Sequence, residues 1–130
     1  MSDSKCARML LDAAERVALT LRNLTARVPD ESFGFHVQQT AEKSFKAWLA
    51  LLDETYPLTH NLELLLHLLS TRGIDTKPFR ELTRYTPYAV EFRYGGVDSS
   101  TPPINREGAL TLVESLLEHV KRQLCEMEAT

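Results

Sequence analysis

Apolar residues recur at alternating intervals of three and four along most of this chain, and this helical period constrains the fold more than any other feature. In the first segment the repeat predicts a helix from about Ser4 to Arg27, through Cys6, Leu10, Ala13, Val17, Leu21 and Leu24. Alternation with period two, which predicts strands, is confined to residues 88–92 and is too short to found a sheet. The pattern predicts an all-α protein.

A second long helix follows a proline. Pro29 interrupts the first repeat, and Asp30 or Glu31 begins the next helix, where an acid favours the positive end of the helix dipole. This helix should run to about Glu54. Pro57 then disfavours a helical conformation in the residue before it.

The rest of the chain predicts two shorter helices, a loop and a long last helix. Residues 62–69 are apolar around most of the helix, as in a helix packed between others, and Gly73 suits a left-handed cap. Pro78 can begin a shorter helix that reaches Tyr85. Residues 94–103 contain Gly-Gly, Ser-Ser and Pro-Pro pairs and predict an exposed loop, after which residues 110–127 are helical again.

Length and connections predict the architecture. At 130 residues the chain suits one domain, spanning residues 1–130. Long amphipathic helices with short connections pack as antiparallel neighbours. We therefore expect an up-and-down antiparallel bundle of four main helices plus one short helix.

Composition excludes several function classes. The 43% hydrophobic and 25% charged residues are typical of a soluble globular protein, and a net charge of -3 argues against a broad nucleic-acid surface. The N-terminus lacks the apolar core of a signal peptide, and no apolar run is long enough to span a membrane, so a cytoplasmic protein is expected. Cys6 and Cys125 have no metal-ligand spacing and predict reduced thiols, with no metal site.

Polar residues interrupt the apolar pattern of the second helix. Gln39, Glu42 and Lys46 share one stripe, and buried polar groups need partners. One interpretation is structural: Glu42 pairs with Lys46, which stabilises a helix by roughly 0.2–0.5 kcal/mol, or is tethered to His60 or Arg93. The other is a cleft in which amides contact a base edge and Lys46 contacts phosphate.

Two other groups of residues leave the same choice open. His60 precedes the third helix, where Thr59 or Asn61 can cap the helix and His60 can bond across to the second helix. Arginines interleaved with tyrosines are the anion-binding candidates: Arg80, Arg84 and Arg93, with Tyr85, Tyr88 and Tyr94. An arginine fork can bind a phosphate, or equally the carboxylate of Glu42 or Glu91.

Three short motifs together resemble the HEPN domain family (higher eukaryotes and prokaryotes nucleotide-binding). They are Gln38-Gln39 with Glu42 and Lys46-Ala47, then Thr59-His60-Asn61-Leu62, then Arg93-Tyr94-Gly95. Asn61 and Gly95 stand where the family usually has Asp and Pro. The order and spacing of the motifs cover nearly the whole chain.

The resemblance implies a helical bundle that forms a homodimer and acts with a small nucleotidyltransferase, as a two-component pair of toxin–antitoxin type. Because the bundle has more leucine than one core needs, we expect the dimer to use Trp48 and Leu51. The resemblance also suggests a nucleotide-binding sensor for ATP or GTP, with no other cofactor. Its candidate site residues are Gln39, Glu42, Lys46, His60, Arg93 and Tyr94.

Catalytic members of the HEPN family share a motif in which an arginine is followed, after roughly four to six residues, by a histidine on the same helix face. No arginine in this sequence precedes a histidine at that spacing. No Ser/His/Asp or Cys/His set replaces it. The sequence therefore predicts a member that is not an enzyme, and an RNA-cleaving HEPN toxin is the least favoured alternative.

Overall fold

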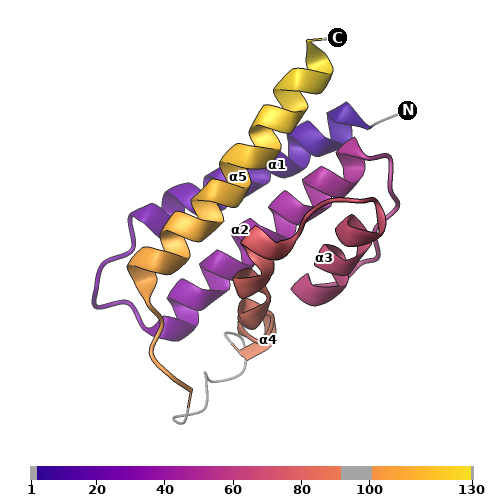
Figure 1. Ribbon diagram of the computed structural model, residues 1–130. Coiled ribbons are helices and arrows are strands. Elements are labelled where there is room, and N and C mark those ends of the chain that lie inside the picture. Colours follow the sequence, from indigo (N-terminus) through magenta and orange to yellow (C-terminus); the bar gives the residue numbers. More distant parts are fainter. Residues whose placement is uncertain (1–2, 92–100, 130) are drawn as a thin grey trace.

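The computed structural model describes residues 3–91 and 101–129, and every regular element in them is a helix (Figure 1). The predicted all-α bundle is confirmed. The four main helices and the one short helix that the sequence predicts are all present. The structure adds one short helix, at Tyr88–Glu91, that was not predicted. The elements are α1 (Ser4–Arg22), α2 (Asp30–Leu51), α3 (Leu62–Thr71), the 3-10 helix η1 (Lys77–Tyr85), α4 (Tyr88–Glu91) and α5 (Arg106–Glu128).

The helix α2 is the centre of the bundle, because it packs against each of the other five elements. α1 and α5 also pack against each other, and α1 runs opposite to both α2 and α5 (Figure 1). The N- and C-terminal ends therefore lie at one end of the molecule, where Arg8 forms an ion pair with Glu128. The smaller elements α3, η1 and α4 cover the remaining side of α2.

The buried face of α1 differs from the predicted one. The buried residues are Ala7, Leu11, Ala14, Ala18 and Leu21, whereas Ala13 and Val17 are only half-buried. α1 packs against two helices at once, α2 and α5, so its buried face is centred between them. The three buried alanines take up little room, which suits a helix held against two neighbours.

Two helices end earlier than predicted. α1 stops at Arg22 rather than Arg27, and the side-chain amide of Asn23 donates to the carbonyl of Leu19, 2.8 Å away. α2 stops at Leu51 rather than Glu54, because Asp53 adopts a left-handed conformation with φ of 56° that a helix cannot continue. The left-handed cap predicted at Gly73 is confirmed, with φ of 83°.

The segment after α3 is a 3-10 helix, a form seldom longer than three or four residues. Its buried residues Phe79, Leu82 and Tyr85 are spaced by three, which matches the three residues per turn of a 3-10 helix. That spacing places all three side chains on one buried line. The predicted short helix is therefore found at the expected position. The spacing of three between its apolar residues explains why it is a 3-10 helix and not an α-helix.

Trp48 and Leu51 are core residues, which corrects their assignment to a dimer surface. They are 4% and 3% exposed, and the Trp48 ring packs edge-on against Phe79 with centroids 6.0 Å apart. Because η1 folds back over the end of α2, it covers the apolar surface that the sequence seemed to leave free. Neither side chain is available to a second copy of the chain.

Arg106 fastens the start of α5 to the start of α2. Its guanidinium donates to Asp30 at 2.8 Å and 3.2 Å and lies 5.0 Å from the centre of the Phe33 ring. Asp30 also accepts from the backbone N–H of Ile104. Burial raises the pKa of Asp30, but these hydrogen bonds and the Arg106 charge lower its pKa by more, so the carboxyl stays ionised.

Candidate functional site

Four polar residues of α2 are buried, and the sequence places them on the central helix where solvent cannot reach them: Gln38, Thr40, Glu42 and Ser44. Two of them bond within the helix. Thr40 donates to the carbonyl of His36 and Ser44 to that of Thr40, at 2.8 Å and 2.7 Å. Gln38 and Glu42 must instead find partners among other side chains.

Glu42 is the centre of a hydrogen-bonded network. Gln38 Nε2 donates to Glu42 Oε1 at 2.9 Å, and His60 Nδ1 lies 2.8 Å from the same oxygen. Lys46 Nζ donates to the other oxygen at 3.1 Å. An ionised carboxylate can only accept, so Nδ1 of His60 carries the proton. The two structural interpretations of Glu42 therefore hold together, since it pairs with Lys46 and is also tethered to His60.

The network continues along α2 and across to the chain that precedes α3. Gln38 Nε2 also donates to the backbone carbonyl of His60 at 3.0 Å, and Gln39 Nε2 donates to Gln38 Oε1 at 2.7 Å. Lys43 Nζ donates to Gln39 Oε1 at 2.8 Å. We call these six residues the Glu42 network: Gln38, Gln39, Glu42, Lys43, Lys46 and His60.

Hydrogen bonds and a neighbouring charge keep Glu42 ionised although it is buried. Burial by itself raises the pKa of this carboxyl, but hydrogen bonds from Gln38, His60 and Lys46, with the Lys46 charge, lower its pKa below the ordinary 4.5. Burial has the opposite effect on an amine, and it lowers the pKa of Lys43. The Lys46 amine also lies 5.9 Å from the centre of the Tyr56 ring. The surroundings of Glu42 thus favour its charged form.

Little of the predicted stripe faces solvent. The side chain of Glu42 is 6% exposed and that of Lys46 is 12% exposed, while the side chain of His60 is 54% exposed. Both ends of the Gln39 amide are already bonded within the chain. The structure brings Gln39, Glu42, Lys46 and His60 together, and their role in binding a nucleotide stays a prediction.

The other predicted anion-binding residues are spread out. Arg93 and Tyr94 lie outside the described residues. Arg84 pairs with Glu81 at 3.8 Å and lies 5.9 Å from the centre of the Tyr85 ring. Tyr85 and Tyr88 are buried in the core, and Arg80 is exposed without a side-chain partner in the part of the chain that the structure describes.

Two members of the network were not among the predicted site residues. Gln38 lies four residues before Glu42, and Lys43 lies four after Gln39, so both pairs are neighbours on one helix face. That spacing was visible in the sequence. The burial of Gln38 was not, because it depends on the chain around His60 closing over it.

Two further classes of site can be assessed within residues 3–91 and 101–129. No group of three His, Cys, Asp or Glu side chains is placed to hold a metal ion there, and both cysteines are free thiols. In the same ranges no helix has the length and apolar character needed to cross a membrane.

A family model described as HEPN domain matches residues 7–124 of the chain. The chain belongs to the HEPN domain family. The match extends from α1 almost to the end of α5 and includes the whole Glu42 network, so the resemblance seen in the three motifs is confirmed. Comparison with curated proteins and with solved structures finds no match. HEPN membership supports a nucleotide-binding or ribonuclease-like class of domain.

Proposed function

We propose that this HEPN domain is a non-catalytic, cytoplasmic subunit that forms a homodimer and binds a small nucleotidyltransferase, as a pair of toxin–antitoxin type. The observation that supports this function best is the closed Glu42 network. Its carboxylate, its amides and the Lys46 amine all have partners within the chain. Such a network holds a scaffold in shape.

The chemistry of Glu42 also argues against a role in proton transfer. A general base works best when its pKa lies near the operating pH. The pKa of Glu42 is shifted away from neutrality, and three donors occupy its two oxygens. The sequence, in addition, has no arginine and histidine at the ribonuclease spacing.

Leu58 is the best candidate for a contact with the nucleotidyltransferase. It is 99% exposed in the connection between α2 and α3. A partner that covered this side chain would gain about 1.5–3 kcal/mol of binding free energy from burying it. Leu64, on the first turn of α3, is also exposed. His60, at the end of this connection, is hydrogen-bonded to Gln38 and Glu42. These bonds restrain the backbone near Leu58.

A search of the neighbouring genes for a nucleotidyltransferase, followed by co-expression of that protein with this chain, tests the function. We expect the two proteins to elute as one complex in size-exclusion chromatography with light scattering, and Leu58→Asp to release the partner while the chain stays folded. Thr55→Asp, an exposed change in the same connection, is the matched control and should retain the complex. A nucleotidyltransferase that elutes alone beside the wild-type chain would refute the proposal.

The nucleotide-sensor alternative has one observation in its favour. Lys43, Lys46 and His60 gather three nitrogen groups able to carry positive charge within the Glu42 network. Calorimetric titration with ATP and GTP tests this site, together with Arg93→Ala. Binding that is weakened in the folded variant would support the sensor. Wild-type chain that releases no heat would exclude it.

A further inference from the structure

A groove of about 410 Å³ lies between the end of α2, the connection from α3 to η1, and the second half of α5. This volume is in the range of small-molecule sites. We call it the aromatic groove, and it is lined in part by Trp48, Leu52, Asp75, Phe79, His119 and Gln123. None of the six belongs to the Glu42 network, so the groove is a separate feature of the molecule.

Three aromatic rings at the groove form one packed cluster. The Trp48 and His119 rings lie 4.8 Å apart between centroids, and Phe79 lies 6.0 Å from each of them. Trp48 and Phe79 are almost fully buried, whereas His119 is partly exposed. The core therefore fixes the rings before any ligand arrives, which reduces the entropy that binding costs.

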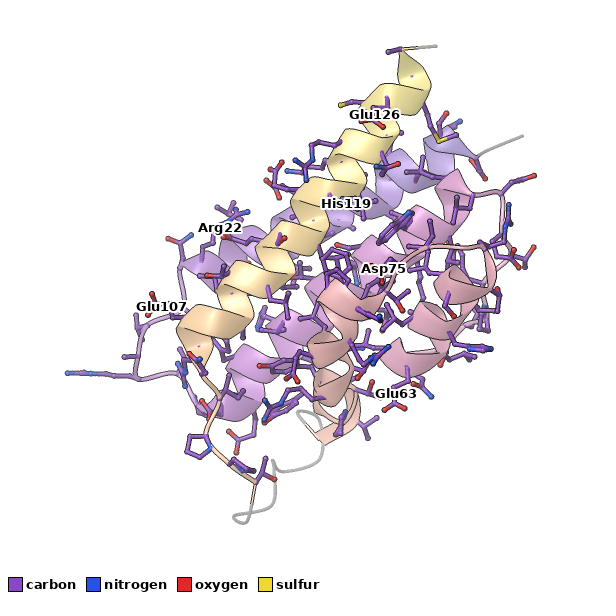
Figure 2. All side chains as sticks on the ribbon, in the orientation of Figure 1. Arg22, Glu63, Asp75, Glu107, His119 and Glu126 are labelled. Carbon is purple, nitrogen blue, oxygen red and sulfur yellow. The ribbon has the colours of Figure 1, made fainter. Side chains whose placement is uncertain are left out.

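Polar groups at the rim are free to bond with a ligand. Asp75 accepts from the backbone N–H of Lys77 with Oδ1 only, which leaves Oδ2 available. Within residues 3–91 and 101–129, the ring nitrogens of His119 and the amide of Gln123 form no hydrogen bond. Asp75 and His119 come from different elements, the connection before η1 and α5, and both line the groove (Figure 2).

The charge of the groove selects among ligands. Among the described lining residues Asp75 is the only acid, and none of them is a lysine or an arginine. A carboxylate accepts hydrogen bonds and repels anions. Aromatic rings attract cations and the edges of other flat rings. The groove therefore suits a flat ring with N–H donors and disfavours a phosphate.

From this arrangement we infer that the aromatic groove binds a small planar aromatic molecule that bears N–H donors and no phosphate. The N–H groups bond to Asp75, while Gln123 and His119 supply further polar contacts. The ligand can be an aromatic cation or an uncharged heterocycle such as a nucleoside. This inference is independent of the proposed function, since a partner subunit can bind its nucleotidyltransferase with the groove empty.

Trp48 is the only tryptophan of the chain, so its fluorescence reports on this groove directly. The probes are benzamidine as the cation, adenosine and guanosine as uncharged heterocycles, and the matching 5'-monophosphates. We expect a saturable change with benzamidine or a nucleoside. Benzonitrile, which has no N–H, should bind about tenfold more weakly, as for the loss of one hydrogen bond to a charged group. The monophosphates keep their N–H donors and should bind more weakly than the nucleosides because the Asp75 carboxylate repels the phosphate.

Asp75→Asn is the decisive variant, because asparagine can keep the oxygen that accepts from Lys77 while it replaces the free acceptor Oδ2 with an uncharged NH2 donor. It should weaken binding about tenfold, whereas Asp12→Asn on the exposed surface of α1 should leave binding unchanged. Comparing the affinity for benzamidine with that for the nucleosides tells whether the groove prefers an aromatic cation or an uncharged heterocycle. The inference is overturned if benzamidine, adenosine and guanosine all fail to give a saturable change. It is also overturned if Asp75→Asn binds as well as wild type, or if the monophosphates bind more tightly than the nucleosides.

Discussion

The Glu42 network and the aromatic groove both place polar groups beside the apolar core of α2. The polar groups of the network are hydrogen-bonded within the chain, whereas those of the groove are left open. In the network, Glu42 has three donors from its own chain and is almost fully buried. In the groove, Gln123 and the ring nitrogens of His119 have no hydrogen-bond partner within residues 3–91 and 101–129. Satisfied polar groups stabilise the fold, and only unsatisfied ones at a surface remain for a ligand.

The largest expected effect comes from the floor of the groove. Trp48→Ala should lower the free energy of unfolding by about 3–5 kcal/mol, because it removes a buried ring that contacts Phe79 and His119. Urea denaturation followed by circular dichroism measures the change. Leu58→Ala, at a fully exposed leucine, is the control and should alter stability by less than about 0.5 kcal/mol. Equal stability of Trp48→Ala and wild type would mean that Trp48 is not a core residue.

The next largest effect should come from the centre of the network. Glu42→Ala should lower the free energy of unfolding by about 3 kcal/mol, since it leaves the Lys46 amine and Nδ1 of His60 without their carboxylate partner. The same urea titration applies, and Glu63→Ala, on an exposed position of α3, is the matched control. A loss no larger than that of the control would remove the contrast between network and groove.

Acid should weaken the network by a smaller amount. The folded-state pKa of Glu42 lies below its ordinary value of 4.5, so its contribution is present above that pH and is lost as the pH falls through the folded pKa. We expect the free energy of unfolding to fall more steeply from about pH 6 to about pH 3 in wild type than in Glu42→Gln. Asp30, whose pKa is also lowered, contributes to both curves alike. Parallel curves would show that Glu42 is not the titrating group.

The smallest effect should come from the rim of the groove. Gln123→Ala removes an amide that has no partner in the described residues, so stability should change by less than about 0.5 kcal/mol. Thermal unfolding of this variant beside Gln38→Ala measures the contrast, because Gln38 is fully buried and bonds to Glu42 and His60. A loss in Gln123→Ala as large as in Gln38→Ala would place Gln123 in the structural framework.

The sequence predicted most of the helices because their apolar period is local. It predicted the site only in part. The pair of Glu42 and Lys46 follows from a spacing of four within one helix, and the tether to His60 was one of two interpretations left open. The burial of Gln38 and of Trp48 could not be predicted, because each contacts a residue far along the chain, His60 at 22 positions from Gln38 and Phe79 at 31 positions from Trp48.

The sequence by itself determined that the chain is helical, that α2 carries a polar stripe, and that it resembles the HEPN family, since these depend on local period and motif order. Only the tertiary structure decided which face each helix buries, because burial depends on the neighbours of a helix. The packing of η1 over α2 made Trp48 a core residue and closed one wall of the aromatic groove. The position of His60 likewise turned the polar stripe into a closed network.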